Sequence, residues 1–269
     1  MRSEAAAAGR HVVCNLLNAE ETAATLRRLT PDIVIHAQAM SDVDRCELEP
    51  QLAQEQNVRT IEHVTRGLSG GRVLLVFVST DYVFDGTKGS PYDEADAPHP
   101  ISIYGASKLE AERVVGRYPK SVVVRTSTLF GPGRSNFCDH LVSQLRSGQP
   151  VEAFIDQTTS PTYTEDLAVG IAELSLGLQR SWHEAPPRMY HLVNAGGASR
   201  VAFARRVAQL LGAPDELVRA IPMATQHRPA RRPPYSALIS RHVGTVTGRT
   251  LRPWDDALHA YLRQQGWIN

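Results

Sequence analysis

Short apolar runs and longer amphipathic stretches alternate along the chain. Residues 73–78 are apolar without a polar gap, which is typical of a strand covered on both faces. Shorter apolar runs predict four more strands, at residues 11–14, 33–35, 122–124 and 190–193. The stretches between them predict helices over residues 18–29, 49–66, 102–116, 137–146 and 164–178. This alternation predicts an α/β fold with a parallel sheet and helices on both faces.

Composition narrows the class of protein. A chain of 269 residues with 42% hydrophobic content makes one large domain or two intimate ones. Its net charge of +1 gives no global field that would recruit nucleic acid or a membrane surface. No apolar run approaches the roughly 20 residues of a membrane span, and the first residues, MRSEAAAAGRHVV, contain no continuous apolar segment of the kind a secretory signal needs.

Cysteine and histidine usage adds two expectations. The three cysteines, Cys14, Cys46 and Cys138, are odd in number and far apart, so we expect free thiols in a reducing cytoplasm. The ten histidines show no paired metal-ligand spacing, so we expect no metal.

The apolar run at residues 73–78 ends in a cluster of polar side chains. Ser79, Thr80, Asp81 and Tyr82 follow one another directly. In an open parallel sheet ligands bind at the carboxyl ends of the strands, so this cluster is expected at the edge of a site. An ordinary polar turn after a strand is the alternative.

A second pattern points to chemistry. Tyr104 and Lys108 are four residues apart at the start of a predicted helix, so they share one face. The chain has only three lysines and eight tyrosines, which makes a chance pair of this spacing uncommon. A nearby ammonium can lower the pKa of a phenol from ~10 by roughly 3 units. Such a tyrosine can protonate a carbonyl oxygen while a hydride reaches the carbon, and Thr80 could hold that oxygen. A surface Tyr–Lys pair is the alternative.

These motifs resemble a known family when they are taken in order. The chain carries VIHAQAMSDVDRCELEP, then STDYVFDG, YGASK and DQTTSPTYTEDLA, followed by YHLVNAGGASRVAFA, RRPPYSALIS and RPWDDALHAYL. The set is similar to the extended short-chain dehydrogenase/reductases, and within them to the dTDP-4-dehydrorhamnose reductase family. The resemblance implies a Rossmann-like nucleotide-binding domain over residues 1–130. The chain would return to this domain at about residues 156–194. A smaller substrate-binding lobe would take up most of 131–269, interleaved with the first domain.

The resemblance also implies a function and a site. The chain would be an NAD(P)H-dependent reductase of a 4-keto nucleotide-diphosphate sugar, using NADPH or NADH. Thr80, Tyr104 and Lys108 would form the catalytic triad. Residues expected at the cofactor are Ala37, Ala39, Ser79, Tyr104 and Lys108. Residues expected at the substrate are Asp81, Tyr82, Asn136, Thr158, Pro161 and Arg232. Arg232 belongs to a stiff basic loop over residues 227–234 that could contact a diphosphate, although solvated arginines explain the loop equally well.

The chain departs from the family at its start. The family begins with a strand, a G-x-x-G-x-x-G turn and a helix whose N-terminus holds the pyrophosphate. The sequence has no such turn, and residues 10–18 resemble the family's third strand and the turn after it. The fold would then be an N-terminally truncated one, unless the native chain starts upstream. Thr128 and Arg200 stand where the family often has aromatic residues, which bears on substrate identity.

A second function follows from the same departure. A chain without the phosphate-binding turn could be a non-catalytic regulatory or binding subunit, like the regulatory β subunit of methionine adenosyltransferase. The expected partners are therefore a nucleotide-sugar substrate and either a second copy or a partner enzyme. Because an unpaired apolar edge invites aggregation, residues 11–14 are expected to move in beside residues 33–35 and pair with them. A strand donated there by a second chain is the alternative.

Overall fold

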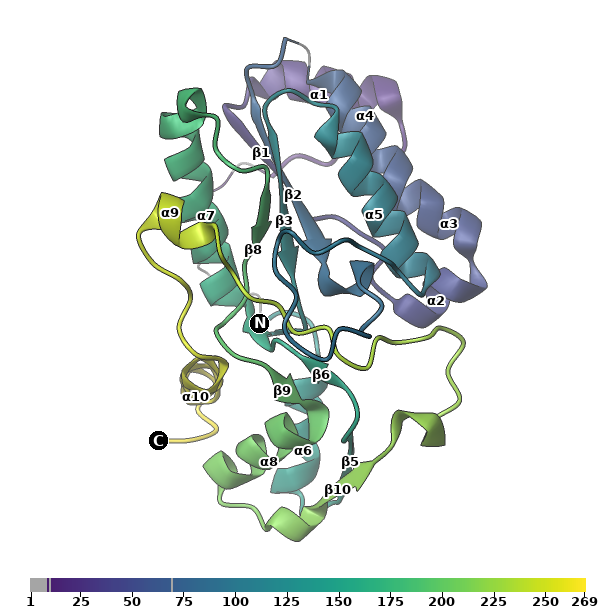
Figure 1. Cartoon of the computed structure of the whole chain (residues 1–269), viewed down its shortest axis with the longest axis vertical. Helices are drawn as coiled ribbons and strands as arrows, with labels where there is room; N and C mark the ends of the chain where they lie inside the picture. The colour runs from purple at the N-terminus through teal and green to yellow at the C-terminus, as the bar shows by residue number, and fades with distance from the viewer. Residues whose placement is uncertain (1–8, 10, 69) are drawn as a thin grey trace.

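The computed structural model describes residue 9, residues 11–68 and residues 70–269. Within these residues the main sheet has four parallel strands in the order β1-β2-β3-β8. The strands are β1 (Ile33–His36), β2 (Leu74–Thr80), β3 (Ser121–Thr126) and β8 (Met189–His191). This arrangement, with helices on both faces, confirms the predicted α/β class (Figure 1).

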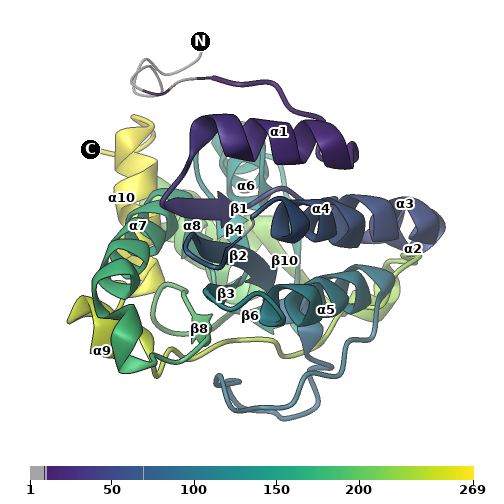
Figure 2. The same ribbon diagram turned by 90° about the horizontal axis from the view of Figure 1, so that it is seen from above.

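Helices cover the two faces of this sheet unequally. On one face lie α4 (Thr60–Gly67) and α5 (Ile103–Gly116), with α1 (Ala19–Leu29) packed against α4. On the other face lies α7 (Thr164–Ser181), with the short α9 (Val243–Thr247) beside it (Figure 2). Before α4 the chain forms α2 (Val43–Leu48), α3 (Pro50–Gln54) and a π-helical turn, Glu55–Arg59.

The side chains of β2 explain its unbroken apolar pattern. Leu74 and Val76 pack against the α7 side, whereas Leu75 and Phe77 pack against α4 and α5. Successive side chains of a strand point to opposite faces, so a strand that is covered on both faces is apolar at every position.

A second hydrophobic core lies beyond the carboxyl ends of the strands, at the bottom of Figure 1. It is built by α6 (Phe137–Arg146), α8 (Arg200–Leu211), α10 (Trp254–Gln264) and the parallel pair β5 (Val151–Phe154) and β10 (Val218–Ile221). Two short strand pairs lie between the cores. They are β4 (Leu129–Phe130) with β7 (Thr162–Tyr163), and β6 (Thr158–Thr159) with β9 (Ala198–Ser199). The chain leaves the main sheet after β3, returns through α7 and β8, and leaves again.

The prediction for the sheet edge is wrong. Residues 11–14 form no strand, and among the described residues β1 pairs only with β2. Val13 is 96% exposed. The reason lies in the following turn, where the Asn15 side chain accepts a hydrogen bond from the Leu17 N–H and the Leu16 carbonyl meets His63 Nδ1 of α4 at 2.8 Å. These contacts fix the turn over α4.

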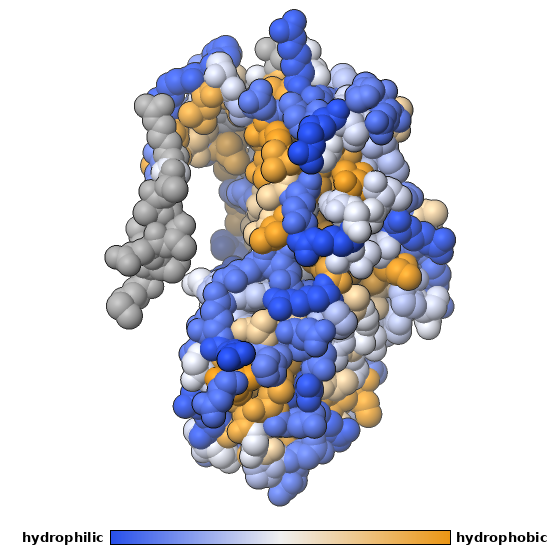
Figure 3. Space-filling model, turned by 90° about the vertical axis from the view of Figure 1, so that its left-hand side faces the viewer, coloured by the Kyte–Doolittle hydropathy of each residue, from blue (hydrophilic) through white to orange (hydrophobic). Residues whose placement is uncertain are grey.

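The open edge leaves apolar side chains exposed. Ile35 of β1 is 47% exposed and shares the α7 side of the sheet with Ile33, because alternate residues of a strand share a face. Val169 and Leu176 of α7 are also about half exposed. Figure 3 views the molecule from the side of α7 and shows hydrophobic residues at the surface of its upper half. No helix among the described residues is long and apolar enough to cross a membrane.

Candidate active site

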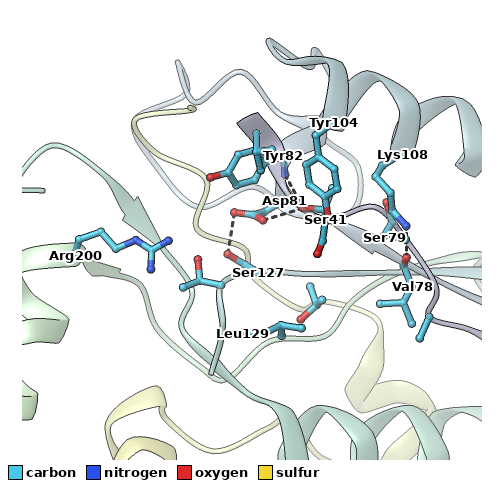
Figure 4. Close-up of a pocket in the computed structure, with 16 residues that line it drawn as sticks. Ser41, Val78, Ser79, Asp81, Tyr82, Tyr104, Lys108, Ser127, Leu129 and Arg200 are labelled. Carbon is cyan, nitrogen blue, oxygen red and sulfur yellow. Dashed lines mark hydrogen bonds between the residues drawn. The ribbon is translucent and has the colours of Figure 1, made fainter. Parts of the chain in front are cut away.

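A cavity of about 430 Å³ opens at the carboxyl ends of β1, β2 and β3. Eight of the twelve residues predicted to contact the cofactor or the substrate line it together (Figure 4). They are Ala37, Ala39, Ser79, Thr80, Asp81, Tyr82, Tyr104 and Lys108. The polar cluster that follows β2 is thus the edge of a cavity, as expected.

Four other predicted residues lie outside this lining. Asn136 caps α6 by accepting hydrogen bonds from the Cys138 and Asp139 N–H groups. Thr158 lies in β6, and Pro161 is buried between β6 and β7. Arg232 forms a two-point ion pair with Asp44 of α2. The contact of these four side chains with a substrate stays a prediction.

Backbone packing positions Tyr104. Helix α5 begins after Ser102, whose hydroxyl accepts a hydrogen bond from the Gly105 N–H at 3.2 Å. A Cβ atom at Gly105 would lie 2.1 Å from the Tyr82 carbonyl oxygen, so only glycine lets the helix approach the turn after β2 this closely. The rings of Tyr82 and Tyr104 meet edge to face with centroids 5.7 Å apart.

Lys108 is buried, with 3% of its surface exposed. Its ammonium donates a hydrogen bond to the Val78 carbonyl at 2.7 Å and lies 4.1 Å from the centre of the Phe77 ring. Burial lowers the pKa of Lys108 to about 7, and the negative charge of Glu112 acts in the opposite direction. The lysine therefore titrates near neutral pH.

The phenol of Tyr104 is affected differently from the expectation. Burial raises the pKa of Tyr104, a hydrogen bond with Thr80 acts to lower it, and the Asp81 carboxylate raises it further. The expected lowering by Lys108 is not found, because desolvation dominates and the ammonium is bonded to the Val78 carbonyl. The phenol therefore keeps its proton at neutral pH, which is the form that a general acid needs.

The Asp81 carboxylate lies in a ring of hydroxyl groups. Asp81 is 2% exposed and accepts hydrogen bonds from Thr80, Ser127 and Ser236. Burial raises the pKa of Asp81, against the effect of these three donors. Ser127 directly follows β3, as Ser79 and Thr80 end β2, so the rule of polar residues at strand ends could have found it. Ser236 comes from a distant segment and carried no local signal.

Arg200 joins this cavity to a second one. It lines the first cavity and also a neighbouring cavity of about 230 Å³ with Phe137, Phe154 and Gln157. Its guanidinium lies 5.0 Å from the centre of the Phe137 ring, and its Nε donates a hydrogen bond to Gln157 Oε1 at 3.4 Å. A cation between a polar and an aromatic cavity suits a ligand with a charged middle and a planar end.

The residues present fit one end of a nicotinamide dinucleotide. Ala37 and Ala39, just beyond β1, add small side chains to the cavity that the hydroxyl and ammonium groups also line. Thr126 also lines the cavity, and its buried hydroxyl has no hydrogen-bond partner in the described part of the chain. The pyrophosphate end fits less well, because the chain has no G-x-x-G-x-x-G turn and the first N–H groups of α1 are capped by the Asn18 side chain. Among the described side chains no cluster of three His, Cys, Asp or Glu could hold a metal ion.

The parallel sheet, the cavity at its carboxyl edge and the Thr80–Tyr104–Lys108 set together define an extended short-chain dehydrogenase/reductase. Comparison with known proteins agrees with this class. The chain belongs to the family described as RmlD substrate binding domain, whose model matches residues 2–266. The predicted resemblance is therefore confirmed.

Curated relatives and solved structures are similar to most of this chain. The chain is 36% identical over 237 residues to dTDP-4-dehydrorhamnose reductase of Mycobacterium tuberculosis, covering 86% of this chain and 76% of that protein. It is 33% identical to the spore coat polysaccharide biosynthesis protein SpsK of Bacillus subtilis, covering 87% of this chain and 80% of the relative. A dTDP-4-dehydrorhamnose reductase structure from Bacillus anthracis, in complex with NADP, superposes with a TM-score of 0.84 at 30% identity, covering 93% of this chain and 87% of that one.

Proposed function

We propose that this chain is an NADPH-dependent reductase of a 4-keto nucleotide-diphosphate sugar, with dTDP-4-dehydrorhamnose as the substrate. The observation that carries the proposal is the convergence of Thr80, Tyr104 and Lys108 on one cavity at the carboxyl edge of the sheet. The names of the relatives support the substrate, and the NADP complex of the Bacillus anthracis relative supports NADPH as the cofactor.

Each of the three residues has a role that its surroundings support. A bound nicotinamide cofactor would supply the hydride for the carbonyl carbon, and Ala37, Ala39 and Ser79 would hold its nicotinamide end. Tyr104 keeps its proton at neutral pH and gives it to the carbonyl oxygen, so that the ketone becomes an alcohol. Thr80 orients that oxygen through its hydroxyl, and the positive charge of Lys108, which does not lower the pKa of Tyr104 before the reaction, would act on the phenolate that remains after proton transfer.

The substrate would extend from this cavity toward the second core. We assign its sugar to the cavity beside Asp81 and Tyr82, and its diphosphate to Arg200 where the two cavities meet. The second core, with α6, α8 and the β5–β10 pair, would then act as the substrate lobe, interleaved with the nucleotide-binding sheet. In this arrangement Arg232 is held by its ion pair with Asp44. Contact between Arg232 and the diphosphate would require the guanidinium to release that carboxylate.

A binding subunit is the second candidate, and one observation favours it. The open β1 edge, with Ile35 47% exposed, could take a strand from a second copy or from a partner enzyme. Sedimentation at two protein concentrations, with Ile35→Lys as the variant, tests this. A stable dimer that the variant dissociates would support assembly through the edge.

For the compartment we propose the cytoplasm, because the three cysteines are free thiols.

The reductase proposal is tested by following NADPH absorbance after addition of dTDP-4-dehydrorhamnose to the purified chain. We expect substrate-dependent oxidation of NADPH that Lys108→Met abolishes. Binding of both ligands without any turnover would favour the binding subunit.

A further inference from the structure

Helix α5 carries a third charged residue in line with the two catalytic ones. Tyr104, Lys108 and Glu112 are spaced four apart, so they lie along one face of the helix. Tyr104 and Lys108 line the cavity, whereas Glu112 lies one turn beyond it and is 6% exposed. The helix face that carries Tyr104 and Lys108 thus continues into the protein interior, where it carries the buried carboxylate of Glu112.

Glu112 is held by an arginine from the sheet. Arg125 of β3, which is 3% exposed, donates two parallel hydrogen bonds to the carboxylate, from Nε to Oε1 at 2.9 Å and from Nη2 to Oε2 at 2.7 Å. Its guanidinium also lies 5.1 Å from the centre of the Phe84 ring. Desolvation of a buried ion pair can cancel its attraction, so stability alone does not explain the pair.

The carboxylate is also bonded to the end of β2. Ser79 Oγ donates a hydrogen bond to Glu112 Oε1 at 2.6 Å. Ser79 lies between Val78, whose carbonyl accepts the hydrogen bond from Lys108, and Thr80, whose hydroxyl lies in the cavity. Two successive residues of β2 are therefore tied to two successive turns of α5.

We propose that Glu112 is a positioning residue of the active site, which locks α5 onto the last residues of β2 and supplies the negative charge that favours the ammonium form of Lys108. The consequence for turnover rests on the proposed reductase function. The electrostatic part concerns only side chains of this chain and stands independently of the substrate.

The charges around Lys108 make this role specific. From its own helix it faces Tyr104 and Glu112, and from β1 it faces His36, a neutral base whose pKa is lowered to about 4 by burial and by Lys108. Arg125 stands behind Glu112 on β3 and opposes its effect. Since burial already lowers the pKa of Lys108 to about 7, loss of the Glu112 charge should lower it further and leave most of the lysine neutral at pH 7.

Nuclear magnetic resonance of the protein without ligands tests the electrostatic part. The chain has only three lysines, so ¹³C labelling at the lysine ε-carbon gives three signals, and Lys108→Arg identifies one of them. In Glu112→Gln we expect the Lys108 titration midpoint to fall by about one pH unit or more, a roughly tenfold change in proton affinity. The matched control is Glu110→Gln, an exposed carboxylate on the same helix, which should leave the midpoint in place. An unchanged midpoint in Glu112→Gln would overturn the proposal.

Kinetics test whether the charge of Glu112 acts on turnover through Lys108. In Glu112→Gln we expect the alkaline limb of the kcat profile to move to lower pH by the same interval, with KM for the sugar unchanged, because Glu112 lies outside the cavity. If Glu112 has a purely structural role, kcat falls at all pH values and the limb stays in place. That result would refute the action of the Glu112 charge on turnover.

A conservative variant covers the case in which Glu112→Gln fails to fold. Glu112→Asp keeps the charge but shortens the reach to Ser79, so the Lys108 midpoint should stay within about 0.3 units of the wild-type value while kcat falls. A fall of a full unit in this variant would contradict the assigned role of the charge. If the wild-type chain shows no turnover but the midpoint moves as expected, the reductase function fails and the electrostatic role of Glu112 survives.

Discussion

Replacement of Lys108 by methionine should make the protein more stable and inactive. Only 3% of the Lys108 residue is exposed, and burial lowers the pKa of its ammonium from 10.5 to about 7. At about 1.36 kcal/mol for each pH unit, this shift means that holding the charged form in the folded state costs about 5 kcal/mol below pH 7. Methionine has a similar length and no charge to desolvate, but it leaves the Val78 carbonyl without its donor, which costs about 1–3 kcal/mol. The net gain in the free energy of unfolding should therefore be about 2–4 kcal/mol at pH 6.5.

The pH dependence gives this prediction its sign. The folded-state pKa of Lys108 lies below the unfolded one, so between pH 7 and 10.5 the unfolded chain binds more protons, and wild-type stability rises with pH through that window. The advantage of Lys108→Met should shrink over the same window. Urea unfolding of both proteins at pH 6.5 and pH 10, followed by circular dichroism, measures the difference, and groups that titrate alike in both proteins cancel. A variant less stable than wild type at pH 6.5, or an advantage that does not change with pH, would refute the reasoning.

Three further predictions concern the same site. Tyr104→Phe should lower turnover by about 10²-fold or more through loss of the general acid, with NADPH affinity unchanged; near-normal turnover would remove Tyr104 from that role. NADPH should bind weakly to these 269 residues, because their sequence offers no glycine-rich turn for the pyrophosphate, and tight binding by calorimetry would show that another segment holds the phosphates. Burial lowers the pKa of His36 from 6.5 to about 4, so the free energy of unfolding should fall as the pH drops through this window. The fall should be about 3 kcal/mol larger than in His36→Gln. Urea unfolding of both proteins measures it, and an equal pH dependence of the two free energies would count against the prediction.

Local sequence signals predicted much of the fold and the polar residues at the centre of the site. The caps Asn18, Ser102 and Asn136 each set the start of a helix through side-chain bonds to nearby N–H groups, so those boundaries were readable from a few residues. The run of polar residues after β2 and the four-residue spacing of Tyr104 and Lys108 are equally local. These signals converge because the carboxyl ends of parallel strands share one edge of the sheet.

The parts that could not be predicted depend on residues far apart in the sequence. Ser236 reaches Asp81 across 155 positions, and Arg232 reaches Asp44 across 188. No periodicity encodes such a pair, which explains why Arg232 was expected at the substrate and not beside Asp44. The raised pKa of Tyr104 was missed for a similar reason, because the degree of burial depends on how α5 packs against the turn after β2.

The sheet edge shows a different limit. The apolar pattern of residues 11–14 favours a strand, and the exposed edge of β1 favours a partner, yet the turn at Asn15 and its contact with His63 direct the segment elsewhere. The apolar pattern of a segment indicates which secondary structure it can form, whereas the contacts of the neighbouring residues decide where the segment lies.

Transfer of a labelled hydride tests the central claim most directly. The chain is incubated with dTDP-4-dehydrorhamnose and NADPH deuterated on the transferred position, and the sugar product is analysed by mass spectrometry and proton resonance. The account predicts one deuterium, located at carbon 4 of the sugar with a single configuration, and a loss of that product by about 10²-fold in Tyr104→Phe. An unlabelled sugar, or a labelled product formed equally well by the Tyr104→Phe variant, would contradict the assignment of this cavity as the site of carbonyl reduction.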